Sequence, residues 1–356
     1  MKKSGQIQIT FNWVYILIAG AVILLFFAGL VIKQKAVSEQ NLATDVVSIL
    51  DSIFTSAGVS SQTKVFLDTS GLSSYTLFFN CQDRVGELGI KGQGQSIQNA
   101  IDPIFAPAEV QTTGLILWSL PYNFPYKVID FLYIIPANAK YYLLGADNDF
   151  IREFTNSTAD ESPRLNINTE FISSLNEVKA TSGILLRLVD LQGNLIVSGP
   201  VPTNLIDSSA TAVTFTAGGI NFYQENKGQW VLSNQDGPLP LISLGGERDA
   251  AKYGAIFSSD ADNYWCNMQK AFHRLQYVTE VYSGKEEEIN DFYTESGGVC
   301  KVLLSSQDNL RSSLLTLQTQ AQSCRYAYSC IDMIKTATRI KTLDNQLWES
   351  HCIRLY

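Results

Sequence analysis

Residues 13–32, WVYILIAGAVILLFFAGLVI, contain no charged side chain and are preceded by only twelve residues. A helix of this length covers about 30 Å, which is the hydrocarbon thickness of a lipid bilayer. The stretch therefore predicts one transmembrane helix, with the rest of the chain on one side of the membrane. Because the apolar run is longer than the core of a secretory signal and no small-residue cleavage site follows it, we expect an uncleaved signal anchor.

The sequence on either side of this segment sets its expected orientation. Two lysines and the α-amino group precede it and two lysines follow it, which is a small bias for the N-terminus inside. Asn156 begins an Asn-Ser-Thr acceptor pattern for glycosylation, which is useful only outside. We therefore expect a single-pass protein of the cell membrane, with residues 1–12 as a short cytoplasmic N-terminus and the C-terminal domain outside.

The cysteines favour the same topology. All six follow the apolar segment, and an even number on one side of a membrane is typical of disulfides in an oxidising compartment. The spacing does not choose among the pairings, and six unpaired buried thiols in a reducing compartment are the alternative. The disulfide candidates are Cys81, Cys266, Cys300, Cys324, Cys330 and Cys352.

Composition limits the partners. Of 356 residues only 17 % are charged, the formal net charge is −8, and no Lys/Arg-rich run follows the apolar segment. A nucleic-acid partner is therefore not expected. The expected partner is the lipid bilayer.

The first twelve residues, MKKSGQIQITFN, carry a specific arrangement in which two lysines precede Gly5 and Gln6. It resembles the N-terminus of archaeal type IV pilin-like proteins with class III signal peptides. In that family the mature chain begins with Gln and has Ser two and Glu four positions further on, where this chain has Gln8 and Thr10. The resemblance covers about thirty of the 356 residues. It implies cleavage between Gly5 and Gln6 and assembly with other membrane or pilus-type subunits; an ordinary signal anchor is the alternative.

Residues 33–58 continue the helical pattern beyond the membrane. Apolar residues recur at helical spacing and form one face: Leu42, Val46, Ile49 and Ile53, with Ala43, Val47, Leu50 and Phe54 alongside. We expect this segment to be an amphipathic stalk that continues the transmembrane helix, with its apolar face packed on the protein's own head.

Residues 59–258 predict an external α/β head. Dense aromatic and β-branched residues, with Pro and Gly between them, indicate strands rather than helices over most of this region. Expected strands are 75–81, 114–120, 128–135, 141–144 and 253–257, a hairpin of 184–189 with 195–197, and a β-meander over 211–232; two helices are expected within 146–181.

Residues 259–356 predict a cysteine-rich helical region packed on the head. Apolar stripes at helical spacing run over 265–282, 310–324 and 331–347, and Gly284 is expected to end the first helix. The fold class is therefore α+β, with a mixed or antiparallel β-rich head and a C-terminal helical part pinned by disulfides.

Motifs for chemistry are sparse. A zinc site around His351 and Cys352 lacks the close pairs of ligands that zinc sites have, and His273 is expected on the surface. The acidic run 286–288 is expected on a solvated helix face. No nucleophile motif is present, so we predict no catalytic, cofactor-binding or metal-binding residues and no cofactor.

Two functions follow from these observations. The first is a non-enzymatic, membrane-anchored extracytoplasmic protein, acting as a pilin-like or accessory subunit of a cell-surface assembly. The alternative is a membrane-tethered envelope enzyme or small-ligand-binding domain, which would require a pocket in the head.

Overall fold

The computed structural model describes residues 45–58, 60–94, 96–145, 149–193, 195–196, 200–206, 208–234, 237–296, 298–305, 309–324 and 330–356. The predicted membrane segment 13–32, the processing candidates Gly5 and Gln6, and stalk residues 33–44 lie outside this set. Among the helices of the described residues, none combines the length and the apolar character that crossing a bilayer requires.

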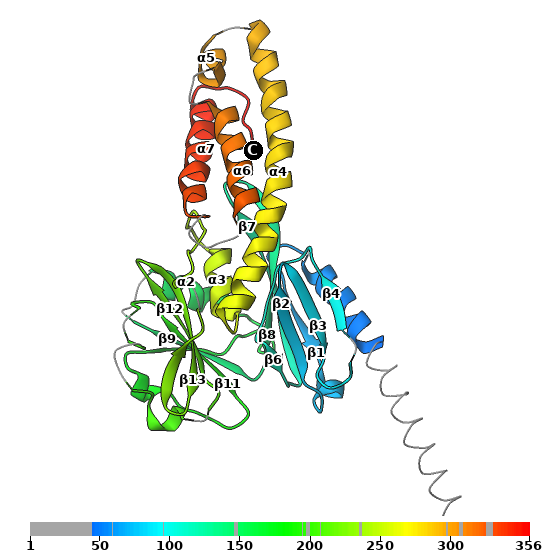
Figure 1. Ribbon diagram of the computed structural model, residues 1–356, viewed down its shortest axis with the longest axis vertical. Coiled ribbons are helices and arrows are strands. Elements are labelled where there is room, and N and C mark those ends of the chain that lie inside the picture. Colours follow the sequence, from blue (N-terminus) through cyan, green and yellow to red (C-terminus); the bar gives the residue numbers. More distant parts are fainter. Residues whose placement is uncertain are drawn as a thin grey trace, which may run out of the picture.

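The described chain is α+β and forms two β lobes with a helical arm above them (Figure 1). The first lobe holds β1 (Lys64–Asp68), β2 (Leu77–Gln82), β3 (Val85–Ile90), β4 (Ser96–Asn99), β5 (Ile104–Phe105), β6 (Glu109–Val110), β7 (Gly114–Asn123) and β8 (Lys127–Pro136). The second holds β9 (Ala139–Leu144), α2 (Asp149–Thr158), β10 (Thr169–Ile172), β11 (Leu185–Asp190), β12 (Thr211–Thr216), β13 (Gly219–Asn226) and β14 (Gln229–Leu232). After α3 (Ala250–Phe257), the arm follows with α4 (Ala261–Ser296), α5 (Val299–Ser305), α6 (Leu310–Ser323) and α7 (Asp332–Glu349).

The first lobe consists of two small sheets that share a core with the helix over residues 45–58. One sheet has the order β1-β7-β8-β5 and is mixed, because β5 runs parallel to β8; the other, β4-β3-β2-β6, is antiparallel. Val47, Leu50 and Phe54 of the helix are buried against these sheets, whereas Ile49 is 59 % exposed. The described part of the predicted stalk therefore packs on the head.

The second lobe is a mixed sheet of order β10-β9-β11-β12-β13-β14. Strands β10, β9, β11 and β12 run parallel, and β12, β13 and β14 form the expected antiparallel meander. A strand buried on both faces carries apolar residues at almost every position, and β11, with sequence LLRLVD, does so. Its Leu186 and Leu188 face one core, while Arg187 and Val189 point to the opposite face, where Val189 joins the main core.

The predicted hairpin of 184–189 with 195–197 is wrong. Strand β11 pairs in parallel with β9 and β12, and residues 195–196 form a turn. The cause is Asp190, which is fully buried and whose carboxylate accepts four backbone N–H groups from the residues that follow. These donors belong to Gln192, Gly193, Leu195 and Ile196, at 2.8–3.1 Å. The backbone near Gly193 thus turns around the Asp190 carboxylate and does not form a hairpin.

Two further predictions in the head are wrong. Residues 253–257 belong to helix α3, because the Asp249 carboxylate caps it by accepting the N–H groups of Ala251 and Lys252. The second helix expected within 146–181 is strand β10 followed by a short 3-10 turn at Leu175–Glu177. Residues 250–257 form a helix where the chain is buried between a sheet and another helix. Such burial cannot be predicted from the local sequence of eight residues.

Helix α4 organises the C-terminal part. It runs without interruption through Gly284, so the predicted end of the helix at this glycine is wrong. With 36 residues it is about 54 Å long and reaches from the β lobes to the tip of the arm (Figure 1). Its first half packs on β2 and β8, and its second half packs on α6, which in turn packs on α7. The arm and the lobes share one continuous core.

The disulfide prediction is confirmed, since all six cysteines are paired and no thiol is free. Cys81 of β2 is bonded to Cys266 of α4, which ties the first lobe to the long helix. The other two bonds lie in the C-terminal helical part: one joins α5 to the C-terminal tail and one closes the connection between α6 and α7. They are Cys300–Cys352 and Cys324–Cys330.

Candidate ligand-binding pocket

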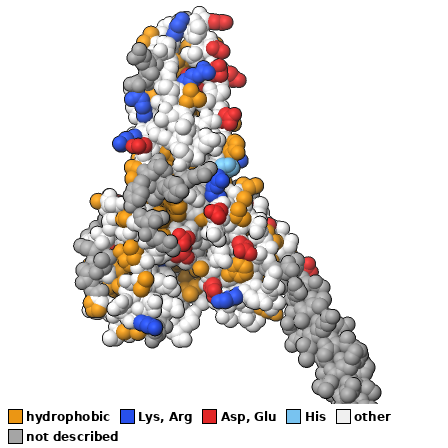
Figure 2. Space-filling view, in the orientation of Figure 1, with side chains coloured by type: hydrophobic (Ala, Val, Ile, Leu, Met, Phe, Trp, Pro, Cys, Tyr) orange, Lys and Arg blue, Asp and Glu red, His pale blue; other side chains and the backbone are white. Residues whose placement is uncertain are grey.

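A cavity of about 410 Å³ opens between the two β lobes beside the end of α3. Its wall on the second lobe is a row of residues at matched positions on four neighbouring strands, Tyr141, Arg187, Thr211 and Gln224. Residues 107–109 of the first lobe and residues 256–260 after α3 complete it. Figure 2 shows hydrophobic and acidic side chains gathered where the two lobes meet below the arm.

Arg187 is the charged group of this wall, and only 5 % of it is exposed. Its guanidinium donates to the carbonyl oxygens of Ala255 (2.9 Å) and Ile256 (3.1 Å) at the C-terminal end of α3, and to that of Ser259 (3.1 Å), two residues beyond the helix. It also lies 5.4 Å from the centre of the Phe222 ring. Arg187 thus caps a helix whose last carbonyls have no partner within the helix.

The charge of Arg187 is not matched by an ion pair with any described acidic residue. The acidic side chain that acts on it electrostatically is Asp260, whose carboxylate accepts hydrogen bonds from the Ser259 hydroxyl and from the N–H of Asn263. Burial lowers the pKa of Arg187 to about 10, so the group keeps its proton at neutral pH. A buried cation whose hydrogen bonds all go to neutral carbonyls can accept an anion.

Ser258 supplies a second polar group to the cavity lining. It is 1 % exposed, and its Oγ has no hydrogen-bond partner in the described part of the chain. Its backbone N–H is used, since it closes the last turn of α3 by donating to Gly254 O at 3.0 Å. An unsatisfied buried hydroxyl costs about 1–3 kcal/mol, which a ligand atom bonded to it would recover.

Two larger polar hollows continue from this cavity along α4. The second, of about 700 Å³, shares Ala108 and Asp260 with the first and surrounds the Cys81–Cys266 bond. The third, of about 650 Å³, shares Asp83 and Gln269 with the second. Carboxylates and amides line both of these hollows, and Arg84 and His273 also line the third.

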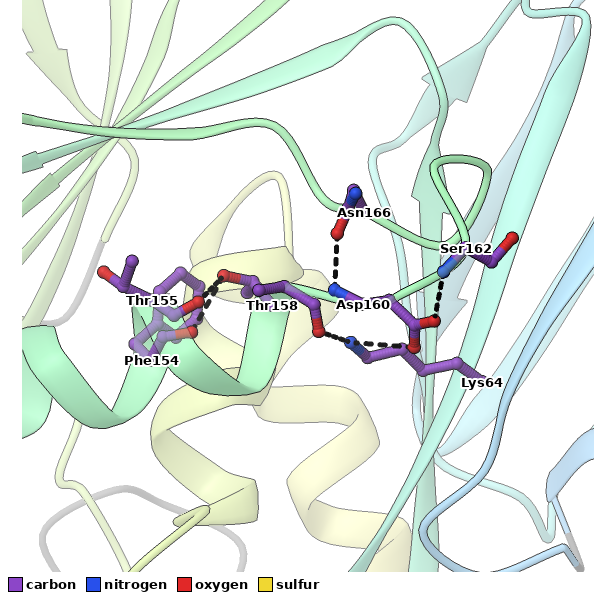
Figure 3. Close-up of polar contacts among 8 residues, drawn as sticks. Lys64, Phe154, Thr155, Thr158, Asp160, Ser162 and Asn166 are labelled. Carbon is purple, nitrogen blue, oxygen red and sulfur yellow. Dashed lines mark hydrogen bonds and ion pairs between the residues drawn. The ribbon is translucent and has the colours of Figure 1, made fainter.

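A separate group of polar contacts joins the first lobe to the end of α2, and its role is structural (Figure 3). The Lys64 ammonium of β1 donates to the carbonyl of Ala159, just after α2, at 3.1 Å, and lies 3.9 Å from the Asp160 carboxylate. Asp160 in turn accepts the N–H of Ser162 at 3.0 Å. A lysine at a helix C-terminus satisfies orphan carbonyls and the helix dipole. Burial lowers the pKa of Lys64, and Asp160 opposes this shift.

The remaining residues singled out in the sequence do not line the 410 Å³ cavity, although His273 lines the third hollow. Asn156 is exposed on α2. His273 is exposed on α4, where its ring packs edge-on against Tyr277, and burial together with Arg84 lowers its pKa. The cysteines of the zinc alternative are all in disulfides, and within the described residues no cluster of His, Cys, Asp and Glu is arranged to hold a metal.

Glu286 departs from the expectation of a solvated acidic face. It is 1 % exposed, because α4 turns this side chain toward the core of the arm. Its Oε2 has no hydrogen-bond partner among the described groups, and burial raises its pKa. Glu287 and Glu288 remain outside, as expected for the other faces of the helix.

Lys270 is the second buried cation of the head. It lies on α4 with 3 % exposure, and its ammonium donates to the carbonyl of Asp102 at 3.0 Å. Burial lowers its pKa from 10.5 to about 8, while Asp102 opposes the shift. It does not line any of the three hollows, so we interpret it as a structural contact between α4 and the first lobe.

The pKa of Lys270 gives a testable pH dependence. Below pH 8 both the folded and the unfolded chain hold the proton, and the folded state bears the full cost of burial, about 3 kcal/mol. Between pH 8 and 10.5 only the unfolded chain holds it, so this cost disappears as the pH rises. Lys270→Met is therefore expected to raise the free energy of unfolding by up to about 3 kcal/mol at pH 7 and to lose this advantage toward pH 10.5.

Urea unfolding of the variant and the parent at pH 7, 8, 9 and 10 checks this. Lys335→Met is the control, because Lys335 is exposed on α7 and its loss should change stability little at any of these values. A difference between Lys270→Met and the parent that is constant over this pH range would show that the Lys270 charge is not the cause.

Sequence reasoning missed Arg187 and Ser258. A signal for Arg187 was present, because a single arginine inside the apolar run 184–189 is a charge that must be buried with a partner. The partner could not be read from the sequence, since the α3 carbonyls lie almost seventy residues further along the chain. No sequence pattern distinguishes Ser258, because a serine just before a helical stripe is an ordinary helix-capping residue.

Comparison with known proteins assigns no family to this chain. No family model, no curated protein and no solved structure matches the chain. What the pocket does must therefore follow from its own residues.

Proposed function

We propose that this chain is a non-enzymatic, membrane-anchored extracytoplasmic protein whose head binds a small ligand. Of the two functions that the sequence leaves open, the cavity at Arg187 favours ligand binding. The observation that carries the proposal is a buried cation without an ion-pair partner in the described chain, set in the wall of an apolar cavity. Concave, mostly apolar sites with a few placed polar groups are the usual form of small-ligand sites.

Two further observations support the location. Three disulfides and no free thiol suit an oxidising, extracytoplasmic compartment. The apolar stretch 13–32, continued by the stalk, would hold the head at the membrane with residues 1–12 inside.

Fluorine NMR with the full chain in lipid nanodiscs tests ligand binding. The probe is a set of water-soluble fluorinated fragments that includes anionic, neutral and cationic members, with empty nanodiscs as the blank. Ala108→Trp fills the rim of the cavity, and Ala217→Trp adds the same ring at an exposed turn of the second lobe. We expect fragments to bind the parent and Ala217→Trp, and Ala108→Trp to weaken them at least tenfold. Equal binding by both variants, or no binding by the parent, would contradict the proposal.

A second candidate function, the accessory subunit of a pilin-like surface assembly, is favoured by the helical arm. The arm exposes large apolar side chains on its outer surface: Val281 at 72 %, Val302 at 67 %, Trp348 at 65 % and Phe292 at 56 %. Exposed apolar groups of this kind are common where subunits associate. The intact mass of the protein from its native membrane tests it: a chain beginning at Gln6 supports pilin-type processing, and one that retains Met1 or Lys2 overturns it.

A further inference from the structure

We infer that the ligand of the pocket is a monocarboxylate with an apolar, preferably aromatic, body, and that its carboxylate lies against Arg187 and Ser258. This inference rests on the proposed binding function and adds the chemical class.

The guanidinium of Arg187 has donors to spare. It carries five N–H groups, of which three are used on the carbonyls of Ala255, Ile256 and Ser259. The two that remain have no acceptor in the part of the chain that the structure describes. A carboxylate oxygen is the acceptor that a guanidinium binds most strongly, and it would also balance a positive charge that is otherwise buried without an ion pair.

Ser258 gives the second contact. Because its Oγ is buried and unpartnered, it can donate to the other oxygen of the same carboxylate. Ser258 directly follows α3, whose last carbonyls hold Arg187, and both residues line the same cavity. One planar head group would therefore satisfy both.

The charges at the rim limit the ligand to a single negative charge. Glu109 and Asp260 line the cavity; Glu109 is paired with Lys91 at 2.6 Å, and Asp260 caps the start of α4. The negative charge of Asp260, and to a smaller extent that of the Lys91-paired Glu109, repels a second anionic group on the ligand. A phosphate or a dicarboxylate would therefore be disfavoured relative to a monocarboxylate.

The apolar part of the wall suits an apolar body. Ala139, Leu185, Ile256, Tyr141 and Phe257 line the cavity, and the last two offer aromatic contacts. Its volume of about 410 Å³ fits a small molecule rather than a polymer segment. An aromatic ring buried against such side chains gains both transfer energy and ring packing.

A matched set of three ligands tests the head group. 3-(4-Fluorophenyl)propanoate, 3-(4-fluorophenyl)propan-1-ol and 3-(4-fluorophenyl)propylamine share one body and differ only in charge. We expect the full chain in nanodiscs to bind the carboxylate at least tenfold more tightly than the alcohol, and the amine most weakly. If the alcohol or the amine binds as tightly as the carboxylate and Ala108→Trp still blocks it, the inference fails while the binding function stands. If none of the fragments binds, the binding function itself fails.

Ser258→Ala separates a ligand contact from a structural role. It should weaken binding of the carboxylate ligand by about two- to tenfold, which is the size of one net hydrogen bond. The melting temperature of the free protein should not fall, because the Ser258 hydroxyl has no hydrogen-bond partner among the described residues. Ser313→Ala is the matched control, since Ser313 is also buried but lies on α6 and donates to Asn309 O. It should leave the affinity unchanged. An unchanged affinity in Ser258→Ala would overturn the assigned contact.

Discussion

Replacing both Cys81 and Cys266 with alanine is expected to lower the free energy of unfolding by about 5 kcal/mol. The two cysteines are 185 positions apart, so their bond removes much more freedom from the unfolded chain than a short loop does. It also fixes the start of α4 on β2, beside the second hollow. Because small domains are stable by only about 5–15 kcal/mol, the loss should be visible as partial unfolding at ordinary temperatures.

The matched control is the double variant Cys324→Ala with Cys330→Ala. That bond closes a loop of sequence separation 6, for which about 2 kcal/mol is expected. Guanidinium unfolding of both double variants without reductant, followed by tryptophan fluorescence, measures the two losses. If removal of the short-loop bond costs as much as removal of Cys81–Cys266, loop closure is not the main source of the stabilisation.

Arg187→Met is the second substitution with a large expected effect. It should lower the free energy of unfolding by about 3–5 kcal/mol. It removes the donors from three carbonyls at and just beyond the end of α3 and leaves them buried without partners. Arg187→Lys should recover part of this loss, because an ammonium can still reach some of the carbonyls but lacks the planar fork. Thermal unfolding of the parent and both variants, monitored by circular dichroism, measures the order of their stabilities.

Arg311→Met serves as the control for Arg187. Arg311 is half exposed on α6 and pairs with Glu287 at 3.4 Å, so its removal should cost less than about 1 kcal/mol. If Arg187→Met is no more destabilising than Arg311→Met, the contact between Arg187 and α3 does not hold the second lobe to the helices.

Local sequence patterns predicted much of the fold. The strands over 114–120 and 128–135 were expected from their dense aromatic and β-branched residues, and the helices over 310–324 and 331–347 from apolar residues at helical spacing. The even number of cysteines on one side of the apolar segment likewise predicted the disulfides. Their pairing was open, because Cys81 and Cys266 come together only through the packing of α4 on β2.

The errors in the fold occurred where tertiary contacts outweigh local preference. Residues 253–257 look like a strand, but Asp249 caps them as a helix that lies on the first lobe. Gly284 looks like a helix end, but α4 continues because α6 packs along it. In both cases the deciding partner is distant in the sequence.

The candidate site was not predictable as a site. Its wall combines residues 107–109, the row through Arg187 on four strands, and residues 256–260, and no motif links them. Arg187 could be recognised as an unusual charge in a strand, whereas Ser258 matters only because the fold leaves its hydroxyl without a partner. A site made of one cation and one hydroxyl has no spacing that a sequence pattern could capture.

Cysteine labelling of the full chain from its native membrane tests most directly whether the head is extracytoplasmic and stabilised by disulfides. The protein is alkylated before any reduction, digested and analysed by mass spectrometry. We predict no alkylated cysteine and three linked peptide pairs, Cys81 with Cys266, Cys300 with Cys352, and Cys324 with Cys330. Six alkylated cysteines in the unreduced protein would place the head in a reducing compartment and contradict the account.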